Sequence, residues 1–130
     1  MLQSERAVRE FFDRLNTGDL EQLRPLIQGA TWRPMIKDMT SAEAYSGDAI
    51  IDAFMRPVRG IFAPGDPKVS IDLLVASEDA VAVETKGYGA LADGRPYDNR
   101  YAWFFQLDGD RIVEIHEYLD SNYVATLTAK

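Results

Sequence analysis

The sequence predicts an α+β fold in which a curved antiparallel β-sheet wraps around N-terminal helices. Apolar residues recur at helical spacing in the first part of the chain, whereas apolar and polar residues alternate from Val69 onward. Gly87 and Gly89 lie inside one expected strand, where glycine favours a bulge or sharp curvature. Helices and strands are therefore segregated along the chain, and the curled sheet should form a cone.

Two helices are expected at the start of the chain. Ser4 is the expected N-cap of the first helix, and Gly18 suits the residue after its end. Asp19 begins a capping-box-like sequence for the second helix, which Gly29 ends. Phe11 either packs in the core or forms the floor of a pocket. The apolar faces comprise Ala7, Val8, Phe11, Phe12 and Leu15, then Leu23, Leu26 and Ile27.

A short strand is expected at residues 30–33. It should end there, because Pro34 cannot continue the strand. The following residues show no clear period. Met35 and Met39 there are either core filler or pocket wall, and Asp38 is expected as a solvated loop carboxylate.

A third helix is expected to begin at the cap residue Asp48, with Ile50, Ile51, Phe54, Val58 and Ile61 along one face. Pro57 should kink or end it.

Four strands should follow, at residues 69–75, 81–89, 97–107 and 111–120. The dipeptide Asp108-Gly109 favours a tight hairpin between the last two, because glycine tolerates positive φ. A cone with an apolar interior is the default place for a ligand.

Composition narrows the function. The 130 residues fit a single domain spanning 1–130, and the net charge of −7 disfavours nucleic acids and anionic membranes. The chain has no cysteine, which excludes disulfides and thiol catalysis. We see no membrane-spanning run and no signal peptide, so the cytoplasm is the default location. Neither metal-ligand spacing nor a phosphate loop is present, and we expect no metal and no cofactor.

Several stretches resemble the nuclear-transport-factor-2-like superfamily, and within it the SnoaL-like, ketosteroid-isomerase-related proteins. They are Trp32 after the helix pair and residues 46–54, 93–101 and 108–120. The resemblance implies a cone-shaped, cystatin-like α+β barrel, often dimeric, with a deep apolar pocket. Members include isomerases, polyketide cyclases, dehydratases, epoxide hydrolases and proteins without chemistry, so the fold does not select among these.

The last hairpin carries the candidate catalytic residues Asp120, His116 and Tyr101. By resemblance, Asn99, Tyr101 and Asp120 fall at positions that often line the pocket. Burial would raise the pKa of Asp120, suiting it as a general base on a carbon acid or as a protonated donor. The alternative is that Asp120 caps the end of the strand or pairs with an arginine. His116 is either an acid–base group, or a surface residue or hydrogen-bonded core histidine.

Other hairpin and helix residues are expected to bind the ligand. Tyr101 and Tyr118 can present a hydroxyl to a carbonyl oxygen, and Asn99 can orient that carbonyl. The aromatic residues expected around the ligand are Trp103, Trp32, Phe11, Phe54 and Tyr88.

Complete catalytic sets of two branches are missing. Epoxide hydrolases of this superfamily need an arginine and a second aspartate where this chain has Glu84-Thr85-Lys86-Gly87, and the dehydratases use two histidines where this chain has one. Three hypotheses remain: a cofactor-independent isomerase or cyclase acting on a small hydrophobic carbonyl compound, a non-catalytic binder of such a molecule, and a dimerisation module. A homodimer is expected in each case.

Overall fold

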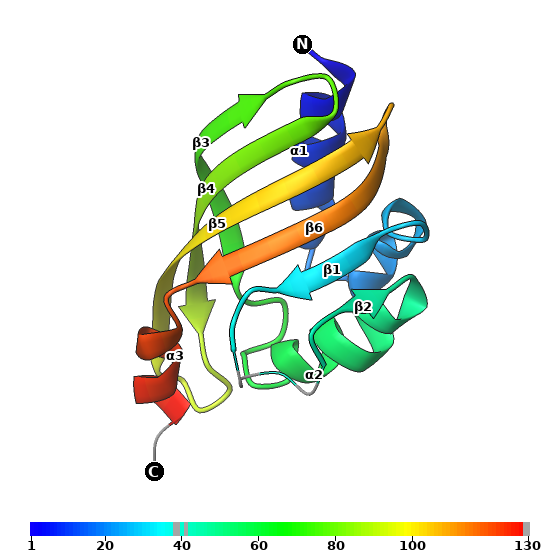
Figure 1. Ribbon diagram of the computed structural model, residues 1–130. Coiled ribbons are helices and arrows are strands. Elements are labelled where there is room, and N and C mark those ends of the chain that lie inside the picture. Colours follow the sequence, from blue (N-terminus) through cyan, green and yellow to red (C-terminus); the bar gives the residue numbers. More distant parts are fainter. Residues whose placement is uncertain (38–39, 41, 129–130) are drawn as a thin grey trace.

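The computed structural model describes residues 1–37, 40 and 42–128, and it shows one curled sheet with helices inside and beside it (Figure 1). Asp38 and Met39, for which a loop and a core or pocket role are expected, lie outside the described residues. The helical elements are α1 (Gln3–Leu15), η1 (Leu20–Gln22), η2 (Arg24–Leu26), η3 (Ile50–Met55), α2 (Arg56–Arg59) and α3 (Ser121–Thr128). The strands are β1 (Thr31–Pro34), β2 (Tyr45–Ser46), β3 (Lys68–Ala76), β4 (Ala80–Ala90), β5 (Pro96–Asp108) and β6 (Arg111–Leu119).

The sheet has six strands in the order β2-β1-β6-β5-β4-β3. Strands β3 to β6 form the expected antiparallel meander, whereas β1 pairs in parallel with β6. The α+β class is confirmed. Because β2 and β3 are the two ends of the strand order, the curved sheet does not close into a complete barrel.

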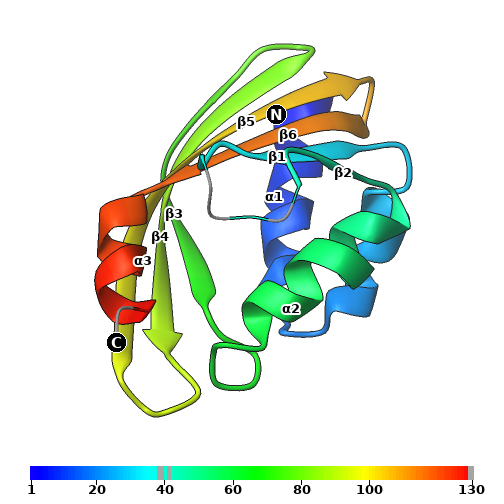
Figure 2. The same ribbon diagram turned by 60° about the horizontal axis from the view of Figure 1, so that its bottom comes forward.

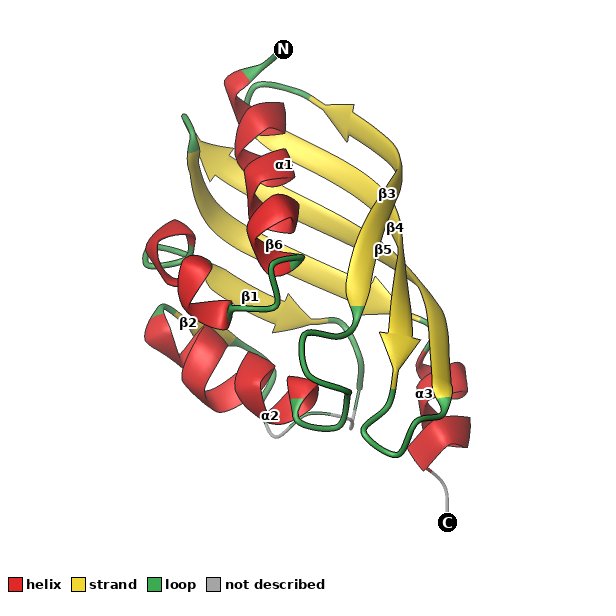
Figure 3. Cartoon of the chain, turned by 180° about the vertical axis from the view of Figure 1, so that it is seen from behind, coloured by secondary structure: helices red, strands yellow, loops and turns green. Residues whose placement is uncertain are grey.

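Helix α1 lies across the concave face of the sheet (Figure 3). Phe11 packs edge-on against Phe105 with ring centroids 5.3 Å apart, and Phe12 packs against Trp103 at the same centroid distance. Such edge-to-face pairs add to the free energy of burying the rings. The expected cap is wrong: Ser4 is buried inside the helix, and its hydroxyl donates to the carbonyl oxygen of Ser77.

The expected second and third helices take other forms. Pro25 lies in the second region, where two 3₁₀ turns, η1 and η2, replace one α-helix. The third is a π-helix, η3, followed by α2, which carries Pro57 in its first turn. A proline has no N–H to donate, so Pro57 lies where the helix changes from π to α, and α2 ends two residues later at Arg59.

A bulge changes the faces of β3. The pairing of β3 with β4 shifts between Ile71 and Leu73, so the period-two pattern changes phase there. Val69 is buried as expected, but Leu73 and Val75 point outward. Together with Phe104 and Tyr118 they form the outer-face patch, in which Phe104 and Tyr118 are in edge-to-face contact.

Helix α3 was not expected from the sequence. Asp120 stands directly before it, and its Oδ1 accepts a hydrogen bond from the backbone N–H of Tyr123 at 3.1 Å, the geometry of an N-cap. Figure 2 shows α3 and the η3–α2 segment on opposite sides of the open end of the sheet. No helix in the described ranges is long and apolar enough to cross a membrane.

Candidate functional site

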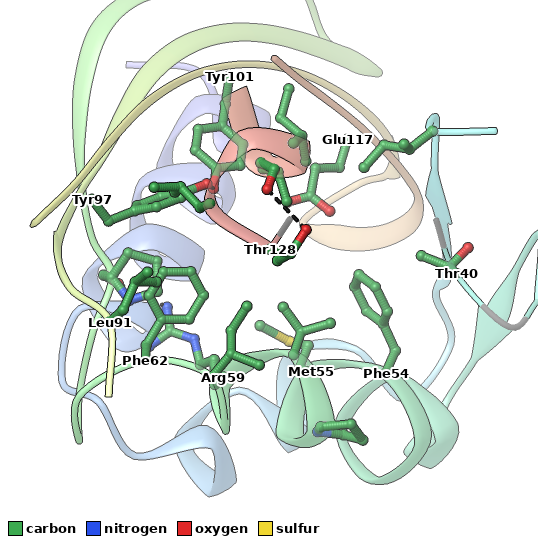
Figure 4. Close-up of a pocket in the computed structure, with 18 of the residues that line it drawn as sticks. Thr40, Phe54, Met55, Arg59, Phe62, Leu91, Tyr97, Tyr101, Glu117 and Thr128 are labelled. Atoms are coloured by element: carbon green, nitrogen blue, oxygen red, sulfur yellow. Dashed lines mark hydrogen bonds between the residues drawn. The ribbon is translucent and has the colours of Figure 1, made fainter. Parts of the chain in front are cut away.

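A cavity of about 920 Å³ lies between the inner face of the sheet, the η3–α2 segment and α3 (Figure 4). Its volume is within the range of small-molecule sites, and most of its lining is apolar. Phe54, Met55, Phe62 and Leu91 contribute apolar walls. The polar side chains that reach the interior are few, and each has a defined local environment.

Glu117 is the buried carboxylate of this cavity. It lies on β6 between Ile115 and Leu119, on the strand face that points inward, and is 9% exposed. Burial raises its pKa from 4.5 to about 7, because the charged form loses its hydration. The hydrogen bond from Trp32 and the positive charge of Arg59 oppose this shift. The carboxyl can therefore gain or lose a proton near neutral pH.

The parallel pairing of β1 with β6 positions Trp32 beside this carboxyl. Trp32 is opposite Ile115 in the register, and its Nε1–H donates to Oε1 of Glu117 at 3.2 Å. Trp32 is almost completely buried and packs against Phe11 and Phe54. The indole therefore orients the carboxyl without lining the cavity.

Two tyrosine hydroxyls meet on β5. The Oη atoms of Tyr97 and Tyr101 are 2.6 Å apart, and Nδ2 of Asn99 donates to Oη of Tyr97 at 2.9 Å. Burial raises the pKa of both tyrosines, so both hydroxyls are neutral. One of the two hydroxyl hydrogens forms the bond between them. The other hydrogen is not used in that bond, whichever tyrosine is the donor.

Gly87 leaves room for the ring of Tyr101. A Cβ atom at Gly87 would lie 2.5 Å from Cε1 of Tyr101. Of the two expected alternatives, a bulge or sharp curvature, the bulge is wrong, because the register of β4 with β5 is continuous through Gly87 and Gly89. Gly87 instead permits close approach of the tyrosine ring to the backbone.

Arg59 brings a cation to the opposite wall. It is half-buried at the end of α2, and Figure 4 shows it across the cavity from Tyr101 and Glu117. Its Nη2 donates to the carbonyl oxygen of Pro67 at 3.0 Å, and Nη1 is 3.5 Å from that of Asp66. Burial lowers its pKa, while Tyr101, Asp66 and Glu117 act in the opposite direction.

Helix α3 forms part of the cavity wall through Val124, Leu127 and Thr128. Besides the Asp120 cap, Oη of Tyr123 accepts from the N–H of Asp98 at 3.1 Å. Nη2 of Arg95 donates to the carbonyl oxygen of Leu127, also at 3.1 Å. These contacts tie α3 to the start of β5.

Three of the residues proposed from the sequence line the cavity: Tyr101, Trp103 and Phe54. Three others are buried next to it. Asn99 hydrogen-bonds Tyr97, whereas Phe11 and Trp32 belong to the aromatic core behind the lining.

The other four lie outside the cavity, which corrects their expected placement. The side chain of Asp120 is exposed because it caps α3. His116 and Tyr118 lie on the face of β6 opposite to Glu117, and His116 contacts Glu114 with Nε2 3.1 Å from Oε1. Tyr88 is 47% exposed, since its strand alternates and Gly87 takes the inward position.

Sequence reasoning missed Glu117, Tyr97 and Arg59. The sequence did contain a signal for Glu117, because period two places it with Ile115 and Leu119 on the apolar face. Tyr97 likewise shares the parity of Asn99 and Tyr101. Nothing in the helical pattern of α2 distinguishes Arg59 from a surface arginine.

Comparisons with known proteins agree with this architecture. The family model described as the SnoaL-like domain matches residues 8–115. An NTF2-like protein of unknown function from Burkholderia pseudomallei superimposes with a TM-score of 0.85 at 17% identity, covering 100% of both chains. A putative SnoaL-like polyketide cyclase from Jannaschia has a TM-score of 0.79 at 19% identity, covering 98% of this chain and 93% of that chain.

A third structure, of TerC co-crystallised with polyporic acid, has a TM-score of 0.82 at 12% identity and covers 96% of this chain and 97% of that chain. No curated protein matches the sequence. At these identities the structural neighbours establish the fold alone. The match to the family model spans most of the sequence, and the chain belongs to the SnoaL-like domain family.

Proposed function

We propose that this protein is a cofactor-independent enzyme that moves a proton on a small hydrophobic carbonyl compound, as in isomerisation or aldol-type cyclisation. The observation that carries the proposal is the Glu117 carboxyl, which is buried in an apolar cavity with a pKa raised to about 7. A group with a pKa near the working pH is both an effective base and an effective acid.

The tyrosine pair supplies the second element. In the proposed reaction the carboxylate of Glu117 removes a proton from the carbon next to the carbonyl group. The electron pair of that C–H bond moves onto the carbonyl oxygen, giving an enolate. The free hydrogen of the Tyr97–Tyr101 pair donates to this oxygen, in the manner of an oxyanion hole. Protonated Glu117 then returns the proton to another carbon, or the enolate carbon attacks a second carbonyl group and Glu117 protonates the resulting alkoxide.

One structural neighbour, named a putative SnoaL-like polyketide cyclase, supports this class of chemistry, and another was co-crystallised with polyporic acid. The apolar lining suits a hydrophobic substrate, and the buried carboxyl requires neither a cofactor nor a metal to accept a proton.

Deuterium exchange tests the proposal. 2-Tetralone, a small carbonyl probe, is incubated with the protein in D₂O, and loss of its α-proton signal is followed by NMR. We expect faster exchange than in buffer, with a rate that rises through a midpoint near pH 7, where Glu117 loses its proton. Glu117→Gln should reduce the rate at least about a hundredfold, as loss of a general base does.

Glu84→Gln is the matched control, because Glu84 is exposed on the outer face of β4. It should exchange the probe at the wild-type rate. If the wild-type protein binds 2-tetralone but does not accelerate exchange, the enzyme proposal is refuted and the non-catalytic binder remains.

A further inference from the structure

Four charged side chains among the described residues line the cavity, and three of them are paired with an opposite charge or can be neutralised by a proton. Asp93 and Arg95 form an ion pair at 2.8 Å near the rim. Glu117 takes up a proton below about pH 7. Arg59 is the fourth, and no carboxylate in the described part of the chain lies within 4.0 Å of its guanidinium.

Arg59 has hydrogen-bond donors to spare. A guanidinium carries five N–H groups, and the structure uses one each from Nη1 and Nη2 for the carbonyl oxygens of Asp66 and Pro67. Its Nε has no partner among the described residues. No fully buried side-chain nitrogen there lacks a hydrogen bond, so this nitrogen must be accessible from the cavity or the solvent. Half-buried and held by two carbonyl groups, the cation is fixed in place before any ligand arrives.

Such a cation disfavours the binding of wholly apolar ligands, although the rest of the cavity favours them. A wholly apolar ligand would cover the guanidinium and remove its remaining water without replacing the lost hydrogen bonds, which is unfavourable. A carboxylate satisfies the same donors through a charge-assisted and often bidentate pair. The arrangement therefore discriminates between an acid and its neutral analogue.

We propose that Arg59 is a specificity-determining residue that binds the carboxylate of a small, mainly apolar keto acid. The carboxylate pairs with Arg59 on the α2 wall, and the apolar body extends toward the sheet, where Glu117 and the tyrosine pair act on its carbonyl group. This inference rests on the proposed function for the identity of the carbonyl group, but the binding of the acid stands independently of any turnover.

Isothermal titration calorimetry with 2-naphthoate and methyl 2-naphthoate tests the inference. At pH 6 the acid is ionised, whereas most Glu117 is protonated and does not repel it. We expect the wild-type protein to bind the acid at least about tenfold more tightly than the ester, as expected for a hydrogen bond between charged groups. Arg59→Gln should abolish this preference, because it should weaken the binding of the acid and leave the binding of the ester unchanged. Arg59→Lys should retain part of the preference.

Arg100→Gln, on the exposed side of β5, is the matched control and should keep the wild-type preference. Equal binding of acid and ester by the wild-type protein would overturn the inference. An equal loss of affinity for the acid and the ester in Arg59→Gln would also overturn it, because that result would indicate that Arg59 only holds the backbone of residues 66–67.

The two proposals fail separately. Preference for the acid in a protein that does not accelerate α-proton exchange would refute the enzyme and retain the Arg59 site. α-Proton exchange that depends on Glu117, in a protein without a preference for the acid, would retain the enzyme and refute the Arg59 site.

Discussion

Replacing Glu117 with glutamine should stabilise the protein in a strongly pH-dependent way. In the unfolded chain this carboxyl loses its proton at the ordinary pKa of 4.5, but in the folded protein it does so at about 7. Between these values the native state holds the additional proton, so its stability falls as the pH rises. One pKa unit corresponds to about 1.4 kcal/mol, and the wild-type protein therefore loses about 3 kcal/mol by pH 8.

Glutamine cannot ionise, and its side-chain oxygen can still accept the hydrogen bond from Trp32. The variant should thus be about 3 kcal/mol more stable than the wild-type protein at pH 8, relative to their difference at pH 4.5. For a chain of this length that corresponds to a rise of roughly 12 °C in the unfolding temperature. The gain is a large fraction of the total stability of a typical domain, about 5–15 kcal/mol.

Urea denaturation at half-unit steps from pH 4.5 to 8 measures this difference, with Glu84→Gln as the variant that should follow the wild-type curve. The difference in unfolding free energy between Glu117→Gln and the wild-type protein should grow between pH 4.5 and 7 and remain constant above that range. A change in the difference of less than about 1 kcal/mol across the series would refute the buried, proton-binding state of Glu117. A free-energy difference that grows toward acid pH would also refute this state of Glu117.

Three further predictions concern other parts of the molecule. Trp32→Phe removes a hydrogen bond that lowers the pKa of Glu117, so the midpoint of the pH–rate profile for 2-tetralone exchange should move to higher pH. Gly87→Ala places a Cβ atom 2.5 Å from the ring of Tyr101, and urea denaturation should show a loss of about 1–3 kcal/mol, as for other overpacked sites. We also propose that the outer-face patch joins two copies, so Phe104→Glu should convert a dimer into a monomer by light scattering at micromolar concentration.

Each of these has a contrary outcome. A midpoint that stays in place or falls in Trp32→Phe would contradict the role of the indole. Gly29→Ala is the glycine control, because its Cβ would contact nothing nearer than 3.9 Å and should cost far less than the change at Gly87. A wild-type protein that is already monomeric would contradict the dimer.

Periodicity predicts most of the architecture because each long element has one buried face. The apolar residues of α1 and the alternation of β5 identify those faces directly, and in the structure Asn99, Tyr101, Trp103 and Phe105 lie on the inner face of β5. The pattern does not contain the bulge in β3, since both Leu73 and Leu74 are apolar and either could face inward. The parallel pairing of β1 with β6 depends on long-range packing and not on local sequence.

The candidate site was only partly predictable for a related reason. Asp120 is the carboxylate expected from the sequence because its position resembles a pocket position, whereas Glu117 interrupts an apolar face and is not among the expected residues. Residues 121–128 form a helix that takes Asp120 as its cap, which moves that carboxylate to the surface. A buried acid on an apolar strand face is a stronger physical signal than a strand-end acid, because only the first must lose its hydration.

The way α3 is held against the start of β5 has a consequence for access to the cavity. A helix of eight residues is too short to persist alone in water, so α3 depends on its cap, on the Tyr123 and Arg95 hydrogen bonds, and on the packing of Val124 and Leu127. If α3 undocked, one wall of the cavity would widen, because Val124, Leu127 and Thr128 belong to that wall. We expect such a local opening to cost far less free energy than global unfolding. In the proposed enzyme, ligand exchange would then depend on α3, whereas Glu117 and the tyrosine pair would stay fixed on the sheet.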